Sequence, residues 1–239
     1  MYDNLNWLRT KPIAHRGLHG KDISENSIPA FEEAIKHGYA IEIDVRLSSD
    51  GKVIVFHDNQ LWRLTQSRGH VREKNYRDIK KLFLSETNDK IPLLSEALDC
   101  IRGRTPLLIE IKNKWNPGKL ELAVAKILES YNGEFAIASF NPLSLKWFKK
   151  NQPSFTRGQT LDKCWQRTLI RILGLFKNDP QFVAYHYSRS LPLKIIRECH
   201  KRNIFLIAWT VRTQEEMDNA LRISDNVMFE GFEPSLSLI

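Results

Sequence analysis

The stretch IEIDVRLSSDGKVIVFHD, residues 41–58, contains two β-branched runs separated by a polar turn. The Asp-Gly pair at 50–51 is a strong hairpin signal, so the run at 53–57 is predicted to fold back on the strand at 40–45. We therefore count the two runs as one strand position with a hairpin-like extension. This count determines how many strands the main sheet contains.

Short apolar runs and amphipathic stretches alternate along the rest of the chain. Further strand-like runs lie at 12–15, 106–112, 135–140, 156–161, 182–187, 204–209 and 226–231, and helix-like stretches lie at 28–38, 93–103, 142–151, 191–203 and 213–223. Strands alternating with helices predict a parallel sheet whose faces are covered. With the hairpin counted once there are eight βα units, so we predict an α/β fold of the closed (β/α)8 TIM-barrel type. An open doubly wound sheet is the alternative, but no glycine fingerprint follows the first strand.

The stretch 58–90, which follows the hairpin, is polar, basic and poorly periodic, so we expect it to be a small insertion. No internal repeat and no linker argues for a second domain. We therefore expect one domain that covers residues 1–239.

The composition is that of a soluble globular protein, with 42% hydrophobic and 27% charged residues. No run approaches the roughly 18 apolar residues of a membrane span, and the first residues lack the apolar region of a secretory signal. The three cysteines are widely spaced, unlike a disulfide framework or a metal knuckle. These features together predict a cytoplasmic protein.

The formal net charge of +8 is compatible with nucleic acid, an anionic membrane or phosphorylated small molecules as partners. The basic residues are scattered and form no nucleic-acid-binding motif, so we expect no nucleic acid partner. The segment 162–179 combines an apolar face with basic residues. It is interpreted either as a packed barrel helix or as a peripheral membrane contact.

Two carboxylates lie on the strand at 40–45. Because side chains alternate along a strand, Glu42 and Asp44 point to the same face. Two carboxylates facing a barrel interior repel each other unless they are protonated or neutralised, and a hard cation such as Mg²⁺ or Ca²⁺ would neutralise them. An ion pair with Arg46, or a strand edge that faces solvent, is the alternative explanation.

A third carboxylate follows the same pattern on the run at 106–112. Glu110 and Lys112 share one face of that strand, which fits a metal ligand beside a phosphate-binding cation. A buried Glu–Lys ion pair inside the barrel would explain the two residues as well.

His15 and His57 each follow an apolar run, at the position where a barrel strand opens onto the catalytic face. Two imidazoles titrating near neutral pH form a natural acid–base couple, although each alone could be a structural histidine. Together with the acidic residues and with Arg16, which could bind a phosphate oxygen, they indicate a phosphodiester site.

These residues belong to a longer series of motifs that resembles the glycerophosphodiester phosphodiesterase family. The series is HRG (15–17), EN (25–26), PAF (29–31), Gly38, E-x-D (42–44), DG (50–51), HD (57–58), L-x-R-x-T (61–65), IPLLSEAL (91–98), E-x-K (110–112) and WTV (209–211). The resemblance covers most of the chain in order. It implies a TIM barrel with an insertion after the HD motif, and metal-dependent hydrolysis of glycerophosphodiesters to sn-glycerol 3-phosphate and an alcohol.

The resemblance also implies a role for each matching residue. The metal ligands would be Glu42, Asp44 and Glu110, which would hold Mg²⁺ or Ca²⁺. His15 would be the general base and His57 the general acid, with the reverse assignment left open. Arg16 and Lys112 would hold the phosphate, and Trp209 would supply an apolar wall.

The chain departs from the family at its last strand, where NVMFEGFEP replaces the usual Thr-Asp-x-Pro ending. Glu230 is a candidate for the polar role at that strand end, and His186 is expected to be structural or to contact substrate. Two other functions stay open: a lysophospholipase-D-like enzyme that acts on lysophospholipids at a membrane, and a barrel that binds phosphate compounds without catalysis. The sequence leaves the oligomeric state open.

Overall fold

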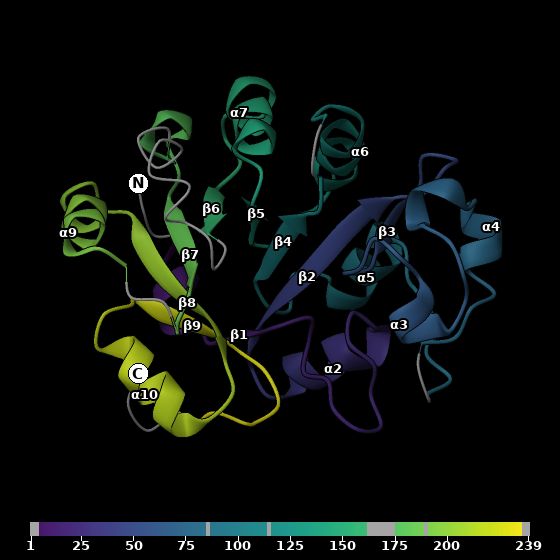
Figure 1. Cartoon of the computed structure of the whole chain (residues 1–239), viewed down its shortest axis with the longest axis horizontal. Coiled ribbons are helices and arrows are strands. Elements are labelled where there is room, and N and C mark those ends of the chain that lie inside the picture. Colours follow the sequence, from purple (N-terminus) through teal and green to yellow (C-terminus); the bar gives the residue numbers. More distant parts are fainter. Residues whose placement is uncertain (1–4, 85–86, 114–115, 162–174, 189–190, 236–239) are drawn as a thin grey trace.

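Eight parallel strands close into a barrel in the computed structural model, which describes residues 5–84, 87–113, 116–161, 175–188 and 191–235 (Figure 1). The barrel strands are β1 (Ile13–Ala14), β2 (Ala40–Leu47), β4 (Leu107–Ile111), β5 (Phe135–Ser139), β6 (Arg157–Leu161), β7 (Phe182–His186), β8 (Phe205–Val211) and β9 (Asn226–Phe229). The short strand β1 pairs with both β2 and β9, and these two pairings close the barrel. The predicted (β/α)8 fold is confirmed.

The predicted hairpin is also present. Strand β3 (Val53–Val55) runs antiparallel to β2, with Val45 opposite Val55. At the turn, Gly51 has a φ of +78° and donates its backbone N–H to the carbonyl of Ser48. Glycine reaches this left-handed conformation without steric cost. The hairpin lengthens β2 beyond the barrel and adds no ninth barrel strand.

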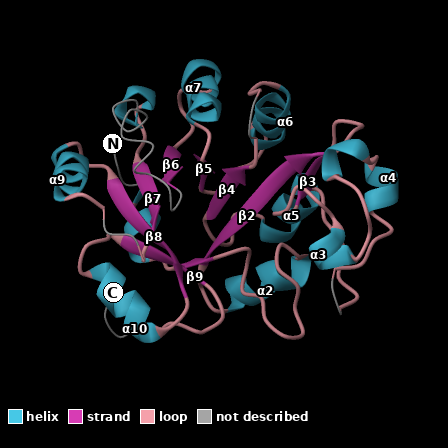
Figure 2. Ribbon diagram, in the orientation of Figure 1, coloured by secondary structure: helices cyan, strands magenta, loops and turns pink. Residues whose placement is uncertain are grey.

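Helices surround the barrel (Figure 2). They are α2 (Ile28–Lys36), α5 (Leu94–Ile101), α6 (Lys119–Leu128), α7 (Pro142–Asn151), α9 (Leu193–Lys201) and α10 (Gln214–Leu221), while the short α1 (Trp7–Thr10) precedes β1. Helix α6 is absent from our sequence-based expectations. Most of the expected amphipathic segment 162–179 lies outside the described residues, which resume with the 3₁₀ turn η4 (Leu175–Asn178).

The strands carry their side chains alternately into two layers of core. One layer lies between the sheet and the helices and includes Ile41 and Ile43 of β2. The other layer fills the barrel itself, where Ala40 and Leu108 are fully buried near the start of their strands. Further along the same inward face, apolar residues give way to charged ones. This change places charge at the carboxyl ends of the strands, where TIM-barrel active sites lie.

Between β3 and α5 the chain forms three short helical turns beside the barrel. These are α3 (Trp62–Thr65), η2 (Val71–Glu73) and α4 (Tyr76–Ile79), and they pack around a hydrophobic cluster of their own. The periodicity in this stretch is weak because each turn has only three or four residues. Among the described residues, no helix combines the length and the hydropathy that crossing a bilayer requires.

Candidate active site

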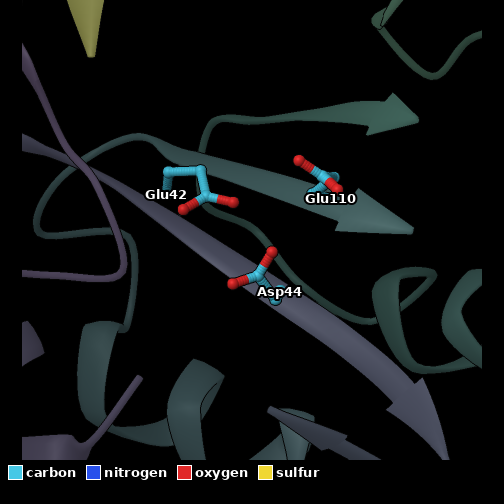
Figure 3. Close-up of side chains that lie close together, drawn as sticks. All are labelled: Glu42, Asp44 and Glu110. Atoms are coloured by element: carbon cyan, nitrogen blue, oxygen red, sulfur yellow. The ribbon is translucent and has the colours of Figure 1, made fainter. Parts of the chain in front are cut away.

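Three acidic side chains meet inside the barrel mouth. Glu42 and Asp44 of β2 and Glu110 of β4 point toward one another, and each offers an oxygen within 4.8 Å of the others (Figure 3). The strand register explains this, because Asp44 lies directly opposite Glu110 and inward-facing positions alternate. All three side chains are buried.

The donor set fits a hard divalent cation. Glu42 Oε1 is a buried oxygen without a hydrogen-bond partner, whereas the buried Asp44 Oδ1 and Glu110 Oε1 are contacted by the ammonium group of Lys112. Buried carboxylate oxygens are normally hydrogen-bonded, so the unpaired oxygen of Glu42, beside two further buried carboxylates, needs an explanation. Oxygen ligands of this kind suit Mg²⁺ or Ca²⁺.

The electrostatics agree with this interpretation. Burial and the charges of Asp44 and Glu110 raise the pKa of Glu42 well above its usual range. Burial likewise raises the pKa of Asp44, but Lys112 and the other nearby cations outweigh it and hold that pKa below its usual range. Lys112 and the other nearby cations therefore keep Asp44 ionised, whereas burial and the neighbouring carboxylates favour the neutral form of Glu42. An added cation would allow all three acids to ionise.

Two basic side chains approach the acidic cluster. Lys112 Nζ lies 2.9 Å from Asp44 Oδ1 and also contacts Glu110 Oε1. Arg16 Nε lies 3.3 Å from Asp44 Oδ2. The alternative partner considered for the acids, Arg46, binds elsewhere: its guanidinium donates to the backbone carbonyl of His57 at 2.8 and 2.6 Å.

The loop after β1 is shaped to hold Arg16 in place. The backbone N–H of Arg16 donates to Glu42 Oε2 at 3.0 Å. Gly17 follows with a φ of +79°, and a Cβ there would lie 2.8 Å from the Cβ of Ala30. Only glycine satisfies both the conformation and the close approach. Asn26 from the same loop donates its side-chain amide to Asp44 Oδ2 at 2.9 Å, a role that we did not predict although the EN motif marked the residue.

The structure brings His15 to the edge of this cluster. Its backbone N–H donates to the carbonyl of Phe229, and its Nδ1 lies 2.7 Å from Glu230 Oε2. Burial lowers the pKa of His15 to about 4, although the Glu230 carboxylate opposes this effect. The hydrogen bond from His15 lowers the pKa of Glu230 to about 2. The pattern places the proton on Nδ1 and leaves Nε2 free of that carboxylate.

His57 follows the same pattern. Its Nδ1 lies 2.6 Å from Asp58 Oδ1, and burial lowers its pKa below the ordinary value. Each histidine is therefore oriented by a carboxylate at Nδ1. We predicted the two histidines, but not the partner role of Asp58.

An aromatic wall stands beside the charged groups. Trp209 of β8 contacts Phe140 edge to face, with ring centroids 5.6 Å apart, and the ring of His186 lies 5.1 Å from Trp209. Lys112 Nζ lies 5.5 Å from the centroid of the Phe140 ring, which joins the wall to the acidic cluster. Phe140 was missing from the predicted site, because it lies just beyond β5 with no chemical motif around it.

A TIM barrel whose mouth gathers acids, cations and two oriented imidazoles has the groups that a hydrolase of phosphoric diesters needs. Residues 15–226 match the model of the glycerophosphoryl diester phosphodiesterase family. A glycerophosphodiester phosphodiesterase of Caldanaerobacter subterraneus is 29% identical over 97% of this chain and 98% of its own length. The chain belongs to the glycerophosphoryl diester phosphodiesterase family.

Solved structures share the fold. A glycerophosphodiester phosphodiesterase of Thermotoga maritima superposes with a TM-score of 0.76 and 26% identity, covering 92% of this chain and 94% of that one. A phosphodiesterase of Oleispira antarctica, solved in complex with the product sn-glycerol 3-phosphate, superposes with a TM-score of 0.78 at 23% identity and covers 93% of both chains. The second likeness shows the fold alone.

Proposed function

We propose that this protein hydrolyses glycerophosphodiesters to sn-glycerol 3-phosphate and an alcohol. The observation that carries the proposal is the meeting of three buried acids, two cations and two carboxylate-oriented histidines in one barrel mouth. Membership of the family and the product bound to the Oleispira antarctica phosphodiesterase support the same substrate class.

We further propose that Glu42, Asp44 and Glu110 hold Mg²⁺ or Ca²⁺. When bound, the ion would supply positive charge toward the phosphoryl oxygens, whose negative charge grows in the transition state. The unpaired Glu42 Oε1 beside two further buried carboxylates supports this assignment. Arg16 and Lys112, already at the cluster, would bind the remaining phosphate oxygens and fix their orientation.

His15 is proposed as the general base and His57 as the general acid. With a pKa of about 4, His15 is neutral at neutral pH and can take a proton from the attacking oxygen at Nε2. Glu230 would stabilise the imidazolium that forms. Asp58, which lies at Nδ1 of His57, would favour the protonated imidazole that gives a proton to the leaving alcohol. Trp209 would contact the apolar part of the substrate.

A cytoplasmic location stays a prediction.

The experiment offers the purified protein glycerophosphocholine, glycerophosphoethanolamine and a lysophospholipid, with and without a chelator. It measures sn-glycerol 3-phosphate from the two water-soluble diesters and lysophosphatidic acid from the lysophospholipid, whose acyl chain stays on the glycerol. We expect release from the water-soluble diesters and its loss on chelation. A His57→Ala variant should be slower by about 10²–10⁴-fold, the usual contribution of general acid–base catalysis. Turnover of the lysophospholipid alone would favour the lysophospholipase-D-like alternative, and binding without turnover would favour the non-catalytic barrel.

A further inference from the structure

Arg63 lies in the short helix α3, outside the barrel, and its side chain is 46% exposed. Its guanidinium nevertheless binds two carboxylates of the site region. Arg63 Nε donates to Asp58 Oδ2 at 2.5 Å, and its two terminal nitrogens donate to the two oxygens of Glu25, each at 2.8 Å. The planar guanidinium thus makes one bidentate contact and one further charged hydrogen bond.

Each of these carboxylates also contacts a residue that we propose to act in catalysis or in phosphate binding. Asp58 Oδ1 lies 2.6 Å from Nδ1 of His57. Glu25 Oε1 accepts a hydrogen bond from Arg16 at 2.7 Å. Five side chains therefore form one continuous series from the proposed acid to the proposed phosphate ligand, with Arg63 at its centre.

Among the described residues, the other histidine has only a weaker link of this kind. Arg212 reaches Glu230, the partner of His15, at a single distance of 3.3 Å, and its side chain is 56% exposed. Arg63 makes three contacts of 2.8 Å or less. A lone exposed ion pair contributes little to a protein, but a side chain that fixes two carboxylates also limits the rotamers of whatever those carboxylates bind.

We propose that Arg63 is a positioning residue that orients His57 through Asp58 and Arg16 through Glu25. The proposal rests on the proposed function and deepens it, since it makes the stretch between β3 and α5 a part of the active site. Arg63 touches no reacting atom. Its two effects separate in kinetics, because misplacing the acid lowers kcat, whereas misplacing a phosphate ligand in the ground state raises KM.

The test measures kcat and KM with glycerophosphocholine for Arg63→Ala in three backgrounds: the unmodified protein, Asp58→Asn and Glu25→Gln. We expect Arg63→Ala alone to reduce kcat/KM by about 10–100-fold, the usual effect of groups that orient catalytic ligands. In the Asp58→Asn background it should change KM only, and in the Glu25→Gln background kcat only. Arg63→Lys places a single compact ammonium group at this position. It should therefore replace the contact with Asp58 or the contact with Glu25, but not both, and so restore at most one of the two kinetic constants.

The matched control is Arg72→Ala in the same stretch. Arg72 is 71% exposed and pairs only loosely with Glu73, at 3.8 Å, so its loss should leave both constants unchanged. Equal factors for Arg63→Ala in all three backgrounds, or no effect at all in an active enzyme, would overturn the proposal. The melting temperature of each variant shows whether the substitution has impaired folding. A merely structural role of Arg63 would not divide its effect between kcat and KM. If the unmodified protein releases no sn-glycerol 3-phosphate, the proposed function itself fails and this inference falls with it.

Discussion

Replacing His15 by glutamine is expected to make the free energy of unfolding fall less steeply as the pH is lowered. Burial lowers the pKa of folded His15 to about 4, against an ordinary value near 6.5. The unfolded chain therefore binds this proton at a higher pH than the folded chain does. The free energy of unfolding must fall as the pH drops from about 6.5 through 4.

The size of the effect follows from the same shift. A difference of this size between the two states corresponds to about 3 kcal/mol of folding free energy lost on acidification. The charged groups that act on His15 are Glu230 and Asp44, which favour its protonation, and Arg16, which opposes it. Glutamine does not titrate, so His15→Gln should remove most of the His15 contribution.

The assay is urea unfolding at pH 7, 6, 5 and 4, followed by tryptophan fluorescence. His200→Gln, a change at an exposed position of α9, serves as the matched control and should keep the slope of the unmodified protein. Because burial lowers the pKa of His57 too, part of the slope will persist in His15→Gln. A His15→Gln variant whose stability falls as steeply between pH 7 and 4 as that of the unmodified protein would refute the reasoning.

Three further outcomes are expected. Mg²⁺ or Ca²⁺ at about a hundred times its Kd should stabilise the protein by about 3 kcal/mol, seen as a chelator-reversible rise in Tm; an equal rise in Asp44→Asn would contradict the metal assignment. Gly17→Ala should cost at least about 1–2 kcal/mol in urea unfolding, because its φ is +79° and the new Cβ would lie 2.8 Å from Ala30, whereas Gly20→Ala, with open space around it, should be close to neutral. Trp209→Ala should raise KM by up to about tenfold with kcat retained, since an aromatic contact contributes about 0.5–1.5 kcal/mol; a loss confined to kcat would argue against the apolar wall.

The barrel could be predicted because its local signals agree. Buried parallel strands form short β-branched runs, and the Asp-Gly turn at 50–51 identified the antiparallel extension. Helix α6 was missed although Glu121 accepts the backbone N–H of Gly118 at its start, at 2.6 Å. This cap uses a buried glutamate instead of the side chain of a Ser, Thr, Asn or Asp, so the usual start signal is absent.

The acids of the site were predictable for a different reason. Alternation along a strand places Glu42 and Asp44 on one face of their strand, and Glu110 and Lys112 on one face of another. No such rule predicts which residues come into contact when they lie far apart in the sequence. Glu230 lies 215 positions from His15, and nothing in the local sequence around either residue specifies their contact. Which carboxylate orients which imidazole depends on how the loops after β1 and β9 meet in space.

The contact between β1 and β9 has a consequence for how the protein is made. His15 is synthesised early, but its backbone and side-chain partners, Phe229 and Glu230, belong to the end of the last strand and the residue after it. A chain that has not yet added β9 lacks both partners of His15. Activity should therefore require β9 and Glu230, and a chain that stops a few residues before Glu230 should turn over substrate more slowly than the normal rate.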